Sequence, residues 1–499
     1  MPQFGLTPNR KVRAAGFLRQ LRSDQPMGNI FAYFMLAAWP AIAIVLTKKK
    51  APDTAVILLL LVPYLILPPI ITLNLGITSS LDKYIVASLV ALLIVRARFG
   101  AMHFLPKSFS IRILIFLLVL SPFLTLLYNR DPIFLPNRVI PGLTIKDVIN
   151  MELFNFCWIY IPFLLGYTWL GNPGAHGKLL AIVSVAGLVY SVPMLWEVRM
   201  SPQLNIKLYG FFPSGFEQQI RAGGFRPVVF LEHGLRVAVF FAMSIMATMT
   251  IYKVADKNKK TERKSRLKLI YMLAVMFLCK TWSALIYTAI AIAIFVATKP
   301  KMWMRFSVIV VALIFAFPFV RTANVLPIHQ VSDFFSQYSS DRAGSLQYRF
   351  DNEDILLDRA NERPLAGWGG WGRSRVYDAT GKDISVTDGT WIIVFGVTGW
   401  IGYIAEFGFV LLPVFFVSRK LRANPQLEVP VCTAGIFIIL AFNMIDLIPN
   451  SSITPFIYLL SGALMGYASL QAHAHDSSVV RGSAKGSAKL FVRFRDLMQ

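Results

Sequence analysis

The sequence predicts an all-α fold, a polytopic transmembrane bundle of about 12 or 13 helices with a large extracytoplasmic loop that contains short helices. Hydrophobic residues make up 56% of the 499 positions and charged residues only 15%, whereas soluble domains carry about 25% charged residues. Many apolar runs approach the roughly 20 residues that a helix needs to cross the hydrocarbon core. Basic residues concentrate in particular connections, which is the positive-inside pattern of membrane proteins.

The apolar runs follow one another along most of the chain. Judged by length and flanking charge, they cover 29–46, 54–72, 80–95, 111–128, 152–170, 178–196, 235–251, 267–280, 282–298, 303–320, 390–417, 430–449 and 453–470. The block 267–298 is too long for one untilted helix and has basic residues on both sides. We therefore expect two shortened helices joined by a turn near Lys280.

The runs and charges divide the chain into five parts. These are a basic N-terminal segment (1–28), a transmembrane bundle (29–320) with an outer loop at 197–234, a large extracytoplasmic loop (321–389), C-terminal transmembrane helices (390–470) and a basic cytoplasmic tail (471–499). Placing the basic connection 253–268 in the cytoplasm puts the three longest other connections outside, so we expect the function at the outer face. The same scheme places Lys48-Lys49-Lys50 inside and leaves the orientation of the N-terminus open.

The net charge of +24 does not indicate nucleic-acid binding. A nucleic-acid site needs a solvent-exposed basic face, whereas the basic excess here lies in short connections between apolar runs. Cys157, Cys279 and Cys432 each lie inside an apolar run and provide neither a disulfide framework nor a metal-binding spacing.

A first candidate site lies in the outer loop 197–234. Arg221, Arg226, Glu232 and His233 precede the helix that begins near Leu235. Arginine offers a fork of donors suited to phosphate, and a helix start also favours anions. The two arginines form a candidate diphosphate clamp, with interfacial arginines that reach lipid headgroups as the alternative. His233 is a candidate catalytic residue, and a satisfied polar residue at a helix end is the alternative.

A second candidate site lies in the loop 321–389, where Ser345 to Asn361 has the pattern of an amphipathic helix. Arg363 and a turn rich in glycine and tryptophan follow. Trp368 and Trp371 offer flat faces that stack on sugars or anchor at the membrane interface. The acids of the helix (Asp351, Glu353, Asp354 and Asp358) are more typical of partners for the helix dipole than of metal ligands, so we predict no metal site.

Two further ionisable residues lie at helix ends. Asp388 directly precedes the helix that begins at Thr390, where a carboxylate acts as a base, as the partner of an arginine or as a solvated cap. Lys280 lies at the turn of the short helical pair. Ionisable residues at membrane depth are candidates for function, and a lysine that reaches outward to the interface is the alternative.

These features resemble the O-antigen polymerase and O-antigen ligase superfamily, membrane glycosyltransferases of the bacterial envelope. Three motifs within about residues 180–420 carry the resemblance. They are Phe225-Arg226-Pro227 with His233-Gly234 before a helix, Lys280-Thr281-Trp282-Ser283 between short helices, and Arg349 with Arg363-Pro364-Leu365-Ala366-Gly367-Trp368-Gly369 followed by Gly396-Val397-Thr398-Gly399-Trp400-Ile401-Gly402. The chain departs from the family where ligases place a histidine, because Asp388 stands there, and the arginine of the usual Ser-Arg step is missing.

The resemblance implies a multi-pass protein of the bacterial inner membrane that transfers undecaprenyl-diphosphate-linked glycans at the periplasmic face, without metal or other cofactor. Polymerisation of an exopolysaccharide or O-antigen agrees better with these departures than ligation. Arg221, Arg226 and Arg349 would hold the diphosphate, and Asp388 or His233 would act as the general base. The implied partners are lipid-linked donor and acceptor glycans, the bilayer and a chain-length regulator. A lipid-linked oligosaccharide flippase and a non-catalytic assembly subunit remain alternatives.

Overall fold

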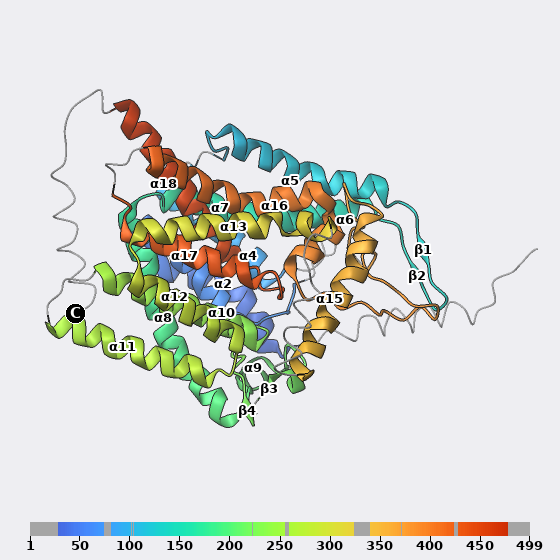
Figure 1. Cartoon of the computed structure of the whole chain (residues 1–499), viewed down its shortest axis with the longest axis horizontal. Coiled ribbons are helices and arrows are strands. Elements are labelled where there is room, and N and C mark those ends of the chain that lie inside the picture. The colour runs from blue at the N-terminus through green and yellow to red at the C-terminus, as the bar shows by residue number, and fades with distance from the viewer. Residues whose placement is uncertain are drawn as a thin grey trace, which may run out of the picture.

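The computed structural model describes residues 28–73, 81–100, 102, 104–221, 223–254, 259–323, 340–370, 372–423 and 428–477. Trp371, the N-terminal segment before Gly28 and the basic tail beyond Ser477 therefore lie outside the described residues. The described chain is mostly helical, and many of its long helices run side by side (Figure 1).

The helices of the first half are α2 (Ile30–Thr47), α3 (Pro52–Ile66), α4 (Lys83–Phe99), α5 (Phe109–Tyr128), α6 (Ile145–Phe154), the π-helix η1 (Asn155–Tyr160), α7 (Ile161–Trp169), α8 (Pro173–Met200), α9 (Leu204–Tyr209), the 3₁₀-helix η2 (Phe216–Gln219) and α10 (Gly234–Val254). Those of the second half are α11 (Lys259–Leu278), α12 (Trp282–Ala297), α13 (Pro300–Thr322), α15 (Ser340–Asn361), α16 (Thr390–Ala423), α17 (Val431–Asp446) and α18 (Pro455–Ser477). Two antiparallel strand pairs join β1 (Ile133–Phe134) to β2 (Val139–Ile140) and β3 (Ile220–Arg221) to β4 (Gly224–Phe225).

The helices confirm a multi-pass membrane protein at the level of length and composition. Within the described residues, seven helical segments are long and apolar enough to cross a bilayer, and four shorter apolar helices accompany them. The predicted apolar runs fall on helices, and the run 152–170 is divided among α6, η1 and α7. The run predicted at 54–72 is shortened, since α3 ends at Ile66 shortly before Pro68-Pro69, and proline cannot continue a helix.

Two predictions about helices in the second half are confirmed. The block 267–298 forms the pair α11 and α12, and the turn between them contains Lys280 with a positive φ of 52°. The expected shortening holds for α12, which has 16 residues, but not for α11, which has 20 residues and begins at Lys259. The amphipathic segment predicted from Ser345 forms α15, which begins five residues earlier at Ser340.

Contacts between distant segments gather the longer connections at one end of the bundle. The Asn29 N–H, at the start of α2, donates to the Tyr209 carbonyl (2.8 Å) of the 197–234 segment. The opposite end of α2 meets the end of α4, where the Arg98 Nη2 donates to the Lys48 carbonyl (2.6 Å). In Figure 1, β1, β2 and α15 lie at the right of the view, and α9, β3 and β4 lie at the bottom, below α10.

Helix α16 is broken at Gly399, whose φ of 62° and ψ of −167° are not helical. The segment Pro364–Gly369 runs beside this break and pairs with it through the backbone. The N–H groups of Trp368 and Gly369 donate to the carbonyls of Gly396 and Val397, both at 2.9 Å. In return the N–H groups of Trp400 and Ile401 donate to Pro364 (2.8 Å) and Leu365 (3.2 Å). The two glycine-rich motifs of the sequence are therefore packed against each other.

Candidate functional site

The segment 220–234 folds as a short hairpin followed by a tight turn into α10. Strands β3 and β4 pair Ile220 with Phe225 and Arg221 with Gly224. The turn that follows contains two non-glycine residues with positive φ, Val229 (47°) and Glu232 (69°). Such conformations cost of order 1–3 kcal/mol each and persist only where the surroundings impose them.

Two buried ionisable side chains impose this turn. The Glu197 carboxylate, at the end of α8, accepts the N–H groups of Val228 (2.7 Å) and Val229 (2.8 Å). The Lys83 Nζ, at the start of α4, donates to the Phe230 carbonyl at 3.0 Å. Glu197 and Lys83 are each only 1% exposed. They hold the backbone between Arg226 and His233 in one conformation.

Arg226 is the most unusual residue of this segment. Its side chain packs beside Gly234, the first residue of α10, and the residue is only 9% exposed. Its Nε is buried and has no hydrogen-bond partner. Among the described residues no carboxylate lies within ion-pair distance of Arg226. Burial, reinforced by the charge of Arg221, lowers the pKa of Arg226 to about 10.

Other basic side chains surround Arg226. Arg221 is exposed on β3, and Arg236 lies one turn into α10. Lys280 reaches the same hairpin, because a Cβ added to Gly224 would lie 2.2 Å from the Lys280 Nζ. We call these four residues, Arg221, Arg226, Arg236 and Lys280, the basic cluster. Within the cluster, Arg236 pairs with the Glu232 carboxylate at 3.0 Å.

Both ring nitrogens of His233 are engaged. The Nδ1 accepts the Leu235 N–H (3.1 Å), so the ring proton lies on Nε2 and faces the Gln218 Oε1 (3.2 Å). Burial, together with Arg226, Arg236 and Arg221, lowers the pKa of His233 to about 4. His233 is therefore neutral near pH 7, and the lone pair that a general base needs is occupied. This geometry argues against the predicted catalytic role of His233 and favours its alternative, a satisfied polar residue.

The predicted anion site at a helix start also changes in detail. The first N–H groups of α10, at Gly234 and Leu235, donate to the Gln219 Oε1 (3.3 Å) and the His233 Nδ1. They are not free to bind a ligand. The guanidinium groups, and not the backbone, are thus the donors that this site offers to an anion.

A second group of candidate residues lies on α15 and at the start of α16. The Arg349 Nε lies 3.9 Å from the Asp388 Oδ2, and the two side chains are 43% and 47% exposed. Two residues that the sequence separates by 39 positions are thus brought together. The prediction that both contribute to the same site as Arg221 and Arg226 is not met by direct contact among the described residues.

The turn between α17 and α18 connects the two groups. The Pro449 carbonyl accepts the Arg349 Nη1 (3.4 Å), and the Ser451 carbonyl accepts the Arg236 Nη2 (3.2 Å). The buried Asp446 carboxylate accepts hydrogen bonds from Asn450 and Ser452 within the same turn. The basic cluster and the Arg349–Asp388 pair therefore face a common element.

The predicted contribution of Trp368 to a glycan site is contradicted by its packing. The guanidinium carbons of Arg359 and Arg363 lie 3.3 Å and 4.0 Å from the centre of its ring, and the residue is only 6% exposed. A sugar cannot stack on a face that a guanidinium covers. Arg363 also pairs with Asp131 at 3.2 Å, which ties this turn to the segment that follows α5.

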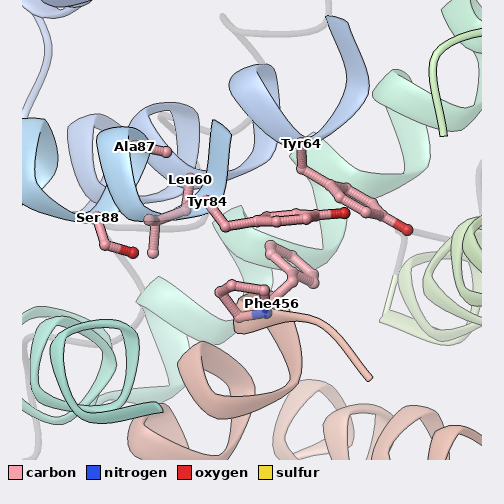
Figure 2. Close-up of a pocket in the computed structure, with 7 residues that line it drawn as sticks. Leu60, Tyr64, Tyr84, Ala87, Ser88 and Phe456 are labelled. Atoms are coloured by element: carbon pink, nitrogen blue, oxygen red, sulfur yellow. The ribbon is translucent and has the colours of Figure 1, made fainter. Parts of the chain in front are cut away.

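A small cavity lies beneath the start of α10, between α3, α4 and α18 (Figure 2). Its lining is mainly apolar and consists of Leu60, Tyr64, Tyr84, Ala87, Ser88, Pro455 and Phe456. The Tyr84 hydroxyl, which accepts the Arg236 Nη1 (3.4 Å), connects it to the basic cluster. Its volume is about 10 Å³, which is room for roughly one water molecule. It is not the site of a glycan.

No protein-family model matches this chain. No curated protein matches its sequence at a significant level either. The proposed function therefore rests on the geometry of the basic cluster and of the Arg349–Asp388 pair.

Lys83 and Glu197 were not predicted to shape the site, because each is a single charge at the edge of an apolar run. Arg321 is a similar case. It is 2% exposed in its side chain and pairs with Glu353 (3.5 Å) and Asp354 (2.8 Å), which ties α15 to the end of α13. In the sequence, Arg321 directly follows an apolar run. An arginine that is buried at such a helix end needs an acidic partner, so its position could have indicated an ion pair with the acids of the next helix.

Proposed function

We propose that this chain is a membrane glycosyltransferase that takes a glycan from a polyprenyl-diphosphate carrier and transfers it to an acceptor glycan. The observation that carries the proposal is Arg226, which is 9% exposed and has no carboxylate partner among the described residues. A buried charge without a counter-charge destabilises the folded state. A diphosphate would supply that counter-charge, and an arginine is well suited to hold it in a two-pronged contact.

The neighbours of Arg226 fit the same ligand. Arg221 is exposed at the edge of the hairpin, and the Lys280 Nζ lies against Gly224. A diphosphate carries more negative charge than one arginine neutralises, so several cations around one buried arginine match it. Holding the charge that develops on a leaving diphosphate is a form of electrostatic catalysis, for which removal of one donor costs about 10²–10³-fold in rate.

The reaction needs an acceptor and a base as well as a leaving group. The acceptor hydroxyl oxygen forms a bond to the anomeric carbon of the donor while the bond from that carbon to the diphosphate oxygen breaks. The hydroxyl proton passes to a carboxylate. Asp388 is the candidate carboxylate, and Arg349 beside it contacts the same turn as the basic cluster.

The resemblance in sequence motifs extends the proposal. It places the protein in the bacterial inner membrane, with the basic cluster and the segment 321–389 on the periplasmic side. It favours a polymerase that acts on undecaprenyl-diphosphate-linked units of an exopolysaccharide or O-antigen, with a chain-length regulator as a partner. These points rest on the order and spacing of the motifs.

Reconstitution into vesicles separates the candidate functions. Purified full-length protein is inserted into vesicles that carry a short glycan on undecaprenyl diphosphate in both leaflets, and the glycan lengths are read by gel electrophoresis or mass spectrometry. A transferase lengthens the glycans and releases undecaprenyl diphosphate in equal amounts. A flippase moves glycans between leaflets, measured by protection from an added glycosidase, without changing their length. A non-catalytic subunit does neither, and either of these last two results would reject the proposal.

A further inference from the structure

Glu353 is a partly buried carboxylate that the proposed diphosphate site does not use. It lies on α15 four residues after Arg349, which places both residues on one face of the helix. Its side chain is 14% exposed. Glu353 therefore lies next to the Arg349–Asp388 pair, on the side of α15 that packs toward α13 and α16.

Charged or polar side chains of α13, α15 and α16 surround Glu353. Arg321 of α13 lies 3.5 Å from its Oε2. Arg349 and Asp354 of α15 act on it with opposite signs, and Trp391 of α16 faces it. Asp354 competes for the same arginine at the shorter distance of 2.8 Å. Arg321 is thus shared between two acids, and its charge does not neutralise both.

Burial raises the pKa of Glu353 to about 7, against the opposing effect of Arg321. Asp388 is more exposed than Glu353, since 47% of its side chain is accessible and the Arg349 Nε lies 3.9 Å from its Oδ2. A general base works best when its pKa lies near the working pH. Burial at a junction of three helices gives Glu353 that property while leaving part of its side chain accessible.

We propose that Glu353 is the general base that takes the proton from the acceptor hydroxyl, in place of Asp388 or His233. This inference rests on the proposed function. In the transfer step, the Glu353 carboxylate receives the hydroxyl proton as the hydroxyl oxygen bonds to the anomeric carbon, and the diphosphate leaves with the bonding electron pair. Arg349, one turn earlier, and Asp388 orient the acceptor. Arg321 holds the carboxyl in place.

The test is the pH dependence of glycan transfer by the reconstituted full-length protein at saturating donor and acceptor. The base must be ionised, so the wild-type rate falls as the pH drops below about 7. Glu353→Gln lowers the rate at pH 8 by about 10²-fold or more and removes this fall. Glu353→Asp, which keeps a carboxyl, restores part of the rate and keeps the fall.

Asp354→Asn is the matched control, because Asp354 lies one position away and binds the same arginine, yet its side chain is 55% exposed. We expect it to keep the wild-type pH profile. If Asp354→Asn and Glu353→Gln reduce the rate equally, the effect is one of ion pairing and the assignment is wrong. An unchanged rate and profile in Glu353→Gln also overturns it. Absence of transfer by the wild-type protein at every pH rejects the proposed function itself, which is a distinguishable result.

Discussion

Gly367 and Gly399 lie backbone to backbone at the break in α16. A Cβ on Gly367 would lie 2.5 Å from the Val397 carbonyl, and a Cβ on Gly399 would lie 2.5 Å from the Leu365 carbonyl. Both glycines have positive φ, 66° and 62°. Only glycine satisfies both conditions. The two glycine motifs therefore build a junction in the protein, and Gly367 does not serve a ligand.

The first prediction concerns this junction. Gly367→Ala and Gly399→Ala each destabilise the protein by about 2–4 kcal/mol or prevent its insertion, because the backbone must separate and a positive φ becomes strained. Thermal unfolding followed by size-exclusion chromatography in detergent measures the effect. Gly370→Ala is the control, since nothing lies within 4 Å of a Cβ at that position. Equal stability of all three variants would contradict the account of the junction.

The second prediction separates two arginines by their partners. Arg226→Met raises the melting temperature, because it removes a buried charge without a counter-charge and keeps an apolar side chain against Gly234. Arg373→Met lowers it. Arg373 is 0% exposed and donates to the Asn129 Oδ1 and to the carbonyls of Trp368 and Pro141, and these two carbonyls would lose their donor. A loss of stability in Arg226→Met equal to that in Arg373→Met would show that Arg226 is a structural residue.

The third prediction concerns Lys280. Gly224→Ala displaces the Lys280 Nζ, which can move because it ends a flexible side chain. If Lys280 binds the diphosphate, Gly224→Ala and Lys280→Met both raise the KM for the lipid-linked donor, and the double variant is no worse than Lys280→Met alone. Additive losses would show that the two positions act independently, and an unchanged KM in Lys280→Met would show that Lys280 is not part of the site.

The fourth prediction follows from the environment of His233. Its pKa is lowered to about 4, so the imidazole stays neutral from pH 5 to pH 8 and adds no step to the pH–rate profile. His233→Asn, which keeps an acceptor for the Leu235 N–H, retains most of the activity and the wild-type profile. A lost acid limb in this variant would restore His233 as the base.

The same shift has a consequence for folding. The pKa of His233 is lower in the folded protein than its usual value of about 6.5. The unfolded chain therefore binds the proton first, and the stability contributed by the neutral ring is present above about pH 6.5 and lost as the pH falls toward about 4. The acid sensitivity of unfolding should be smaller in His233→Asn than in the wild-type protein, as measured by melting temperature between pH 4 and pH 7.

The sequence predicted the helices because hydrophobicity is a property of consecutive residues. The length of the block 267–298 and its flanking charges predicted the break between α11 and α12 correctly. The break at Gly399 was not predicted, since it depends on backbone pairing with Pro364–Gly369 some 30 residues earlier in the chain. A membrane helix tolerates such a break only where other backbone groups satisfy its freed N–H and carbonyl groups.

The candidate site was predicted in part for a similar reason. The clustering of Arg221 and Arg226 could be predicted, because the two residues lie close together in the sequence. The environment of Trp368 depends on Arg359, which lies on α15. The environment of His233 depends on Gln218, which lies on the other side of the β3–β4 hairpin in the chain. Glu353 was visible only as one acid among several, because its burial and its shared arginine come from the packing of α13 against α15.

The most direct measurement of the central claim is the rate of glycan transfer by the purified, reconstituted protein and its Arg226→Ala variant. The account predicts a loss of about 10²–10³-fold in Arg226→Ala, with partial recovery in Arg226→Lys, which keeps the charge but not the fork of donors. Arg375→Ala, which removes a surface partner of Asp383 (3.4 Å), serves as the control and keeps the wild-type rate. Transfer by Arg226→Ala at the wild-type rate would contradict the account.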